Sequence, residues 1–186
     1  MKYKTIVIDP PWKLCLKNIN TANGGRIGKI LPYKTMSDKE IMNFDIEQFA
    51  DEQCNLFMWT TNTKIPAAFE ILKHWGFHYS TCMVWNKNDG ICHNGFHYVL
   101  EYCLYAYRGY KCENGMDYTK PIKPYFEAKR YKHSEKPSVF YAILSKVTPE
   151  PRIDVFARKR HFGFDAYGDQ VEKEMEYPLF ATNHSK

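Results

Sequence analysis

Short apolar runs alternate with helix-start signals along almost the whole chain, and this alternation limits the fold more than any other feature. A capping-box pattern at Ser37 and Glu40 predicts one helix start. Two more helices are expected, from Pro66 to Gly76 and from Pro137 through Lys146. Strands alternating with helices predict an α/β domain with a mainly parallel sheet. The runs expected as strands are residues 3–8, 54–60, 77–85, 98–107 and 152–156.

The composition is that of one globular domain. Of the 186 residues, 44% are apolar and 25% are charged, which argues against disorder and against a fibre. We expect a single domain over residues 1–171 and a surface tail over residues 172–186. No apolar stretch nears the roughly 18 residues of a membrane span, and the first residues lack the shape of a signal peptide. A soluble, cytoplasmic protein without membrane partners is therefore expected.

The six cysteines favour a reduced, structural role. They lie at positions 15, 54, 82, 92, 103 and 112, and no pair has the spacing of a zinc site. Cys54, Cys82 and Cys103 fall inside apolar runs, where a thiol behaves as a small hydrophobic group. We expect no metal site.

The strongest chemical signal is Asp9-Pro10-Pro11-Trp12, directly after the first apolar run. In open α/β sheets, ligands bind beyond the carboxyl ends of the strands. Asp9 offers a carboxylate acceptor, and the two prolines hold a rigid segment whose carbonyl can accept a second hydrogen bond. With Trp12 as a flat surface, the group suits a planar heterocycle that carries an exocyclic amine. The alternative is an ordinary Asp-Pro-Pro turn in which Trp12 is simply packed.

This motif resembles the catalytic signature of S-adenosylmethionine-dependent adenine-N6 methyltransferases. The branch it resembles includes the catalytic subunit of the eukaryotic mRNA adenosine methyltransferase, the methyltransferase-A family. The resemblance spans roughly residues 5 to 171 and implies a Rossmann-like methyltransferase sheet with permuted (β-class) motif order, the catalytic motif first and the cofactor strand last. The segments that carry it after Trp12 are residues 31–37, 56–59, 75–77, 101–104, 134–137 and 153–158.

The resemblance also implies roles for single residues. Asp9, Pro10, Pro11 and Trp12 would be catalytic, with Asp9 also near the reactive end of S-adenosylmethionine. Lys136 would meet the methionine carboxylate of the cofactor. The remaining cofactor contacts are expected at Phe156, Arg158, Lys159, Arg160, His161, Asp169 and Gln170. Substrate contacts are expected at Trp12, Lys13, Arg26, Tyr33, Lys34 and Glu101. The residues alone favour the plainer interpretation, in which Lys136 is a solvated lysine at a helix start and Phe156 is a core residue.

The sequence departs from the family pattern in two places. Lys159-Arg160-His161 stands where members usually carry Pro-His-Asn, and Asp169-Gln170 stands where they often carry Asn-Gln. The glycine-rich cofactor loop of many methyltransferases is replaced by Ala157 and Arg158, directly after the strand. The departures put the contacts at 159–161 and at 169 in doubt.

Three basic segments suit a nucleic-acid partner. Residues 13–36 carry five Lys or Arg and no acidic residue, residues 108–136 interleave basic residues with aromatic ones, and residues 158–160 are Arg-Lys-Arg. Stacking aromatics beside phosphate-binding lysines is the usual design for unpaired strands. A solvated charged face is the alternative, and for residues 108–136 the two readings are evenly matched.

We therefore expect a methyltransferase that acts on the N6 amine of adenine in DNA, on a single-stranded or flipped base. The alternatives are the same reaction on RNA and a non-catalytic nucleic-acid-binding subunit of a methyltransferase complex. The resemblance also allows a homodimer or a related subunit as partner.

Overall fold

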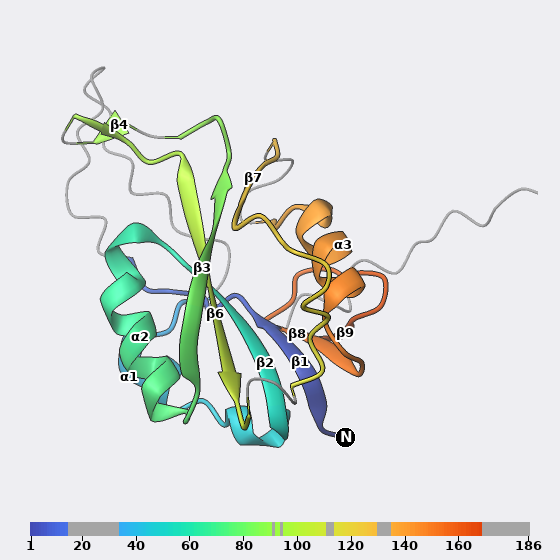
Figure 1. Ribbon diagram of the computed structural model, residues 1–186. Coiled ribbons are helices and arrows are strands. Elements are labelled where there is room, and N and C mark those ends of the chain that lie inside the picture. The colour runs from blue at the N-terminus through green and yellow to red at the C-terminus, as the bar shows by residue number, and fades with distance from the viewer. Residues whose placement is uncertain (15–33, 91, 94, 111–113, 130–134, 169–186) are drawn as a thin grey trace, which may run out of the picture.

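The computed structural model describes residues 1–14, 34–90, 92–93, 95–110, 114–129 and 135–168, and its centre is a seven-stranded sheet (Figure 1). The order across the sheet is β7-β3-β6-β2-β1-β8-β9. The strands are β1 (Tyr3–Ile8), β2 (Ala50–Thr60), β3 (His78–Asn86), β6 (Leu100–Arg108), β7 (Tyr125–Glu127), β8 (Arg152–Val155) and β9 (Asp165–Tyr167).

The sheet is parallel except for one strand. β1 pairs in parallel with β2 and β8, as do β8 with β9 and β3 with β7. β6 runs antiparallel to both of its neighbours, β2 and β3, and its arrow opposes that of β3 in Figure 1. The start of β6 therefore lies at the edge of the sheet where β1, β2 and β3 end. We call this the carboxyl edge.

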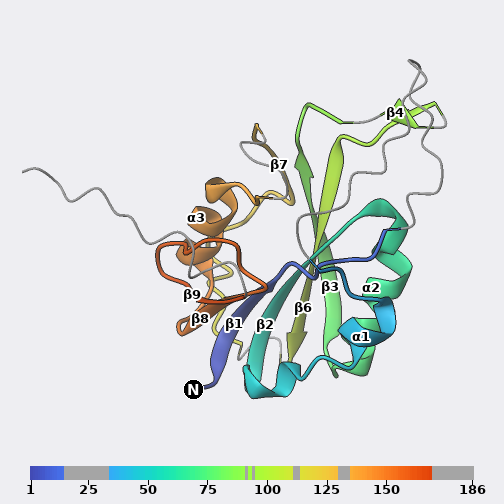
Figure 2. The ribbon, with the colours of Figure 1, turned by 180° about the vertical axis from the view of Figure 1, so that it is seen from behind.

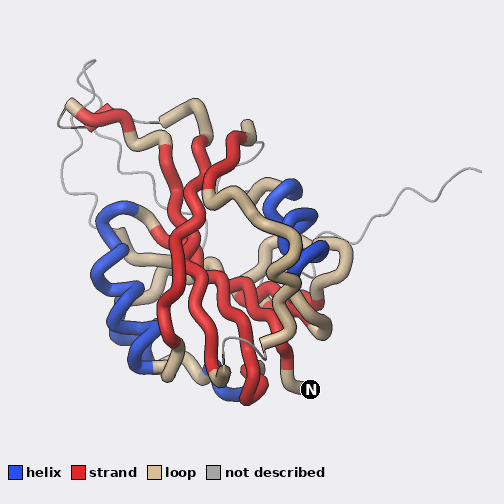
Figure 3. Tube along the Cα trace, viewed as in Figure 1, coloured by secondary structure: helices blue, strands red, loops and turns tan. Residues whose placement is uncertain are grey.

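Helices cover both faces of the sheet, and Figure 2 shows α1 and α2 on one side and α3 on the other. β1 has no exposed apolar side chain from Ile6 to Ile8, because its residues alternate between the two covered faces. Ile6 and Ile8 pack with α1 (Asp38–Met42) and α2 (Ile65–His74), whereas Val7 packs with α3 (Ser138–Val147). Figure 3 shows the strands running between the helices.

The helix-start signals are confirmed. The backbone N–H of Glu40 donates to the Ser37 hydroxyl at 3.2 Å, and the Ser37 N–H donates to the Glu40 carboxylate at 2.7 Å, which completes the capping box. Pro66 lies in the first turn of α2, and Gly76 follows that helix with a φ of +71°. α3 begins directly after Pro137.

The remaining elements are too short for a sequence pattern to reveal. β7 and β9 have three residues each. β4 (Cys92–His93) and β5 (Phe96–His97) have two residues each and pair antiparallel. The short helices η1 (Ile46–Gln48) and η2 (Asn62–Lys64) flank β2.

Two expectations concern the whole chain. Cys54, Cys82 and Cys103 are free thiols, as expected. No helix in the described part of the chain is long and apolar enough to cross a membrane. The expected tail, residues 172–186, lies outside the described residues.

Candidate active site at the carboxyl edge of the sheet

Four charged residues of alternating sign line up along the carboxyl edge. The Lys87 ammonium lies 3.2 Å from the Glu101 carboxylate, whose other oxygen is 3.0 Å from the Lys136 ammonium. The same ammonium lies 3.0 Å from Asp9. Lys87 follows β3, Glu101 is the second residue of β6, Lys136 precedes α3 and Asp9 follows β1. We call Lys87, Glu101, Lys136 and Asp9 the charged row.

The reversal of β6 builds this row. If β6 ran parallel to its neighbours, Glu101 would lie at the opposite edge, about 20 Å or more away for a strand of this length. The row also crosses β2, because the Lys136 ammonium lies 5.1 Å from the centre of the Trp59 ring near the end of that strand. Lys136, expected as a cofactor contact, and Glu101, expected as a substrate contact, are thus brought together with Asp9.

Burial and the neighbouring charges together set the pKa values of the charged row. Burial raises the pKa of Asp9, and the neighbouring Lys136 charge opposes that rise. Burial alone would lower the pKa of Lys136, but Asp9 and Glu101 together raise it above its ordinary value. Glu101 has a lowered pKa, because its two lysine partners outweigh its burial. Lys136 is therefore a permanent cation at neutral pH, enclosed by two carboxylates.

The Asp9-to-Trp12 segment is held by its own backbone. The Trp12 N–H donates to the Pro10 carbonyl oxygen at 2.8 Å, and the Met36 N–H donates to the Pro11 carbonyl oxygen at 2.8 Å. The Asp9 N–H donates to the carbonyl oxygen of Val155, the last residue of β8, at 3.3 Å. A carbonyl has two lone pairs, so that of Pro10 keeps one for a ligand.

Trp12 does not offer an open face. Its side chain is 6% exposed and packs in the core, and its indole N–H donates to the Trp59 carbonyl oxygen at 3.0 Å. The packed arrangement, which the sequence had left as the alternative, is the one in the structure. Trp12 therefore fixes the segment rather than presenting a stacking surface.

The two ends of the basic segment 13–36 meet beside this motif. Trp12 and Met36 form a parallel bridge, and the Lys13 N–H donates to the Met36 carbonyl oxygen at 2.9 Å. Lys13 and Lys34, both expected to contact substrate, are exposed. The other two expected contacts in this segment, Arg26 and Tyr33, lie outside the described residues.

A pocket opens from Asp9 toward the end of β8. Of the expected cofactor residues, Asp9, Lys136, Phe156, Arg158, Lys159 and His161 line it. Arg160 is exposed and does not line the pocket, and Asp169 and Gln170 lie outside the described residues. Glu135, Tyr141, Asp154 and Ala157 complete the lining and were not expected from the sequence.

The backbone after β8 is unusually constrained. Phe156 has a φ of +62°, the left-handed region that a bulky side chain rarely adopts, and its ring centre lies 4.8 Å from that of Phe44. The Ala157 N–H donates to the Tyr167 carbonyl oxygen at 3.0 Å, and Gly168 packs against the same peptide so closely that a Cβ there would lie 2.5 Å from the Ala157 carbonyl oxygen. β9 therefore holds Phe156 in its strained conformation at the pocket wall.

Asp154 and Tyr141 form a buried pair on the floor of this pocket. The Tyr141 hydroxyl donates to the Asp154 carboxylate at 2.6 Å, and the His161 ring stacks on Tyr141 with centres 3.4 Å apart. Burial raises the pKa of Asp154 to about 7 and lowers that of His161 to about 4. A carboxylate inside the otherwise apolar end of the 152–156 run was the available signal for Asp154. Tyr141 reads as an ordinary helix residue, with no signal of its own.

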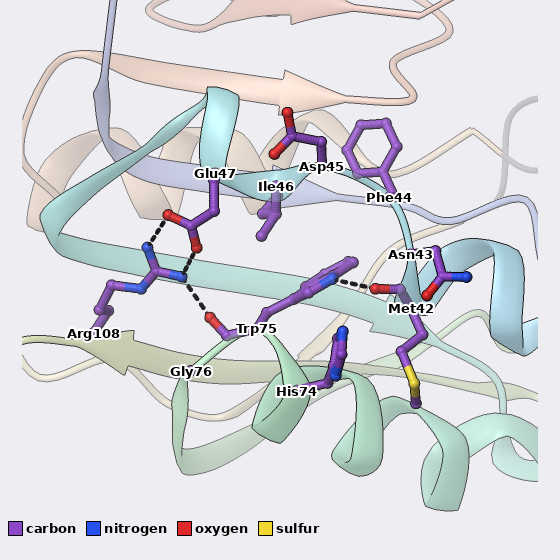
Figure 4. Close-up of a pocket in the computed structure, with 10 residues that line it drawn as sticks. All are labelled: Met42, Asn43, Phe44, Asp45, Ile46, Glu47, His74, Trp75, Gly76 and Arg108. Carbon is purple, nitrogen blue, oxygen red and sulfur yellow. Dashed lines mark hydrogen bonds and ion pairs between the residues drawn. The ribbon is translucent and has the colours of Figure 1, made fainter.

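A second, wider pocket of about 650 Å³ lies at the opposite edge of the sheet (Figure 4). Arg108, at the end of β6, pairs there with Glu47 and donates to the Trp75 carbonyl oxygen, and the Trp75 indole N–H donates to the Met42 carbonyl oxygen at 2.9 Å. None of the residues expected in the site lines this pocket. These contacts of Arg108 and Trp75 tie the end of β6 to η1 and the end of α1 to the end of α2.

A mostly parallel sheet with one reversed strand, and a pocket at its carboxyl edge, define a Rossmann-like methyltransferase. The chain belongs to the MT-A70 family, whose profile matches residues 3–170.

In the described part of the chain, no group of three or more His, Cys, Asp or Glu is placed to hold a metal ion.

Three relatives show the range of this family. The chain is 29% identical to the Type II methyltransferase M.MunI of a Mycoplasma species, over 95% of this chain and 82% of that protein. It is 24% identical to the N(6)-adenosine-methyltransferase MT-A70-like of Arabidopsis thaliana, over 91% of this chain, and 24% identical to the MT-A70-like protein of Drosophila melanogaster, over 84%. The chain spans about a quarter of the length of each of these last two.

The methyl donor of this family is S-adenosylmethionine, and the pocket has the chemistry to hold it. The amino-acid part of that cofactor carries a carboxylate and an ammonium group. The pocket provides a buried cation, Lys136, a buried carboxyl group, Asp154, and the half-buried Asp9 carboxylate, which are complementary to these groups. Phe156 adds an aromatic wall.

Proposed function

We propose that this protein transfers a methyl group from S-adenosylmethionine to the N6 amine of adenine in DNA. The observation that carries the proposal is Asp9, a half-buried carboxylate beside the Lys136 cation in a pocket at the carboxyl edge. DNA is proposed over RNA because the chain covers 82% of the compact Type II methyltransferase, against about a quarter of the adenosine methyltransferases.

In the proposed reaction, Asp9 and Pro10 orient the target. The Asp9 carboxylate accepts one hydrogen bond from the adenine amine, and the free lone pair of the Pro10 carbonyl accepts the other. Together they turn the nitrogen lone pair out of the ring plane and stabilise the positive charge that the nitrogen gains. S-Adenosylmethionine would supply a methyl group on a positively charged sulfur, and the methyl–sulfur bond would break as the new bond to nitrogen forms, leaving a neutral thioether. After transfer, the nitrogen loses one proton, for which Asp9 is the nearest acceptor.

The rest of the charged row places the cofactor in this proposal. Lys136 holds the methionine carboxylate, and Glu101 with Lys87 keeps the Lys136 ammonium at the pocket. Phe156, Arg158 and His161 hold the nucleoside part. The stacking role expected for Trp12 is not carried into the proposal, because that ring lies in the core.

The target adenine must be unpaired in this scheme. In a duplex, the N6 amine is hydrogen-bonded and stacked, which leaves no room for a sulfonium methyl group on the line of its lone pair. A single-stranded adenine or one flipped from the helix satisfies the geometry.

The test is mass spectrometry of nucleosides after incubation of the purified protein with S-adenosylmethionine and unmethylated DNA or RNA in parallel. N6-Methyldeoxyadenosine alone is the expected product. The matched control is Asp9→Ala, which should still bind the cofactor and methylate at less than about one tenth of the normal rate. Product from RNA alone would move the substrate to RNA, and an Asp9→Ala protein above that rate would remove Asp9 from its role.

A non-catalytic subunit is the second candidate, and calorimetric titration with S-adenosylmethionine separates it. Cofactor binding without methylation of either nucleic acid would point to a missing partner subunit. No binding and no methylation would make the protein a scaffold. The intact Asp9–Lys136 pair favours the enzyme.

A further inference from the structure

A single aromatic side chain stands fully in solvent beside the proposed active site. Phe162 is 100% exposed, more than any other large apolar side chain in the described ranges, where Met1 at 87% is next. It lies in the loop between β8 and β9. Scattered exposed apolar residues are ordinary, so its exposure gains meaning only from what surrounds it.

The turn that carries Phe162 is anchored on both sides. His161 stacks on Tyr141 with the ring planes 10° apart, and Phe164 is 7% exposed, packed in the core against the same Tyr141. The Phe164 N–H donates to the His161 carbonyl oxygen at 3.1 Å, and Gly163 adopts a φ of +77°. With both neighbours drawn inward, the backbone directs Phe162 outward and keeps it from folding back onto the protein.

The turn also lies at the rim of the pocket that holds Asp9. His161 lines that pocket, so Phe162 is one residue from its wall. The rim is basic: residues 156–164 include Arg158, Lys159 and Arg160 and no acidic residue. Lys159 is paired with Glu135, whereas Arg160 is exposed.

A rigid, exposed aromatic ring beside an exposed arginine fits an unpaired nucleic-acid strand. Bases stack on aromatic side chains whatever their identity, and arginine contacts the phosphates between them. A protein partner would match the Phe162 ring equally, but it gives no account of the excess of basic residues over residues 156–165, where three stand against the single acidic Asp165. Charge therefore decides between the two.

We infer that Phe162 stacks on a base next to the target adenine in single-stranded DNA and that Arg160 contacts the adjoining phosphate. The inference rests on the proposed function, because it takes DNA as the substrate of the same site. It assigns Arg160 and Phe162 to the DNA strand, whereas His161 between them lines the cofactor pocket. For Arg160 this proposal replaces the cofactor contact that the resemblance implied.

The experiment measures binding by fluorescence anisotropy of a labelled single-stranded, adenine-containing oligodeoxynucleotide. Phe162→Ser should weaken binding by about 5- to 150-fold, the range for loss of one base stack. Phe162→Trp should bind at least as tightly as the natural chain, and Phe162→Leu should resemble Phe162→Ser, because leucine is apolar but cannot stack. Arg160→Gln should reduce the slope of log affinity against log salt by about 0.7, the value for one phosphate contact on a single strand.

The matched control is Tyr79→Ser. Tyr79 is 44% exposed and is the second residue of β3, at the edge of the sheet opposite Asp9, so its loss should leave DNA affinity unchanged. The melting temperature should not change in the Phe162 variants, because that side chain is fully exposed within the described part of the chain. Cofactor affinity, measured by calorimetry, should also be unchanged.

Two results would overturn the inference. One is Phe162→Ser binding DNA as the natural chain does. The other is Phe162→Leu retaining full affinity, since any apolar contact would then serve, including one to a protein. Failure of this inference can be told apart from failure of the proposed function. If the natural protein methylates DNA and Phe162→Ser binds DNA normally, the proposed activity stands and only the role of Phe162 is lost.

Discussion

Lys87 is the residue of the charged row that no sequence pattern indicated, and it acts at a distance. It does not touch Asp9. It pairs with Glu101, which shares Lys136 with Asp9, so the row is neutral as a whole with two cations and two anions. Removing Lys87 leaves one cation for two carboxylates, which makes protonation of Asp9 easier.

We predict that Lys87→Met moves the acidic limb of the pH profile of kcat/KM to higher pH. The pKa of Asp9 should rise with the loss of a nearby positive charge, so the rate on the acidic limb should fall and should recover as the pH is raised. Lys87→Arg should restore the natural profile.

The control is Lys64→Met. This change breaks the 2.7 Å ion pair between Lys64 and Asp38, neither of which belongs to the charged row. It should lower stability slightly and leave the profile in place. If the profiles of Lys87→Met and the natural protein superimpose, Lys87 has no role in positioning.

The pH profile follows the ionisation of Asp9, and the pKa of Asp9 also depends on the charged and titratable groups around it. Lys136, Glu101 and Arg158 act on Asp9 directly, and Asp154, Tyr141 and Cys103 are each coupled to its charge. All of these are unchanged in the Lys87 variants, so a shifted limb reports on Lys87 alone.

Asp154 makes stability depend on pH. Its pKa is about 7 in the folded protein, against 3.8 for an ordinary aspartate, so the folded state holds a proton that the unfolded state has released between these values. Stability from this group is therefore lost as the pH rises from about 4 to about 7. His161 has the opposite sign, since its lowered pKa destabilises the fold as the pH falls from 6.5 to about 4.

We predict that Asp154→Asn gains stability relative to the natural chain as the pH rises through this window. The difference should reach the order of a few kcal/mol by pH 8 and vanish near pH 4. Urea unfolding of both proteins at pH 4, 6 and 8 measures it, and the His161 contribution cancels because both proteins carry it. A difference that does not vary with pH would contradict the raised pKa.

At the scale of elements, the contact between β9 and the segment after β8 shapes the pocket. Gly168 has no room for a side chain, because a Cβ would also lie 2.9 Å from the Ala157 nitrogen and 3.0 Å from the Phe156 carbonyl carbon. The atoms in the way are backbone and cannot rotate aside. Any larger residue must push β9 away from the pocket wall.

We predict that Gly168→Ala destabilises the protein by about 1–3 kcal/mol and weakens S-adenosylmethionine binding at least several-fold. Calorimetry and thermal unfolding measure the two effects. Gly95→Ala is the control. No atom of the described residues lies within 4 Å of a Cβ at that position, so the change should cost only about 1–2 kcal/mol for the positive φ and leave cofactor affinity intact. Normal affinity in Gly168→Ala would show that β9 does not shape the pocket.

Elements with a long pattern were predictable, and short ones were not. The expected strand 3–8 has the same bounds as β1, and the capping box located α1. The three-residue strands β7 and β9 give no measurable period, and their place depends on pairing with distant residues.

Within the site, too, residues in a sequence motif were predictable and residues placed by the tertiary fold were not. Asp9 and Lys136 stand in motifs, whereas Lys87 and Tyr141 reach the site only through the order of the strands, and Trp12 was misread because burial is a property of the tertiary fold.

At the scale of the molecule, the pocket joins residues from both ends of the described chain, so a ligand there ties them together. We predict that S-adenosylmethionine at about 100 times its Kd raises the melting temperature by roughly 5–10 °C, from about 2.7 kcal/mol of binding linkage. Adenosine at the same concentration should give a smaller rise, because it lacks the carboxylate that Lys136 would bind. Equal rises in melting temperature for the two ligands would show that Lys136 does not bind the cofactor carboxylate.

The place of β1 between β2 and β8 has a consequence for how the protein is made. β1 is synthesised first, but its neighbour β8, with the pocket wall beyond it, is added roughly 150 residues later. At about 5–20 residues per second, Asp9 waits on the order of ten seconds on the ribosome before its pocket exists. During that interval one edge of a strand that ends in the apolar run Ile6–Ile8 has no partner, and an unpaired strand edge is the usual template for mispairing between chains. The protein therefore depends on its last strands to cover its first, and conditions that slow or truncate synthesis should favour aggregation over activity.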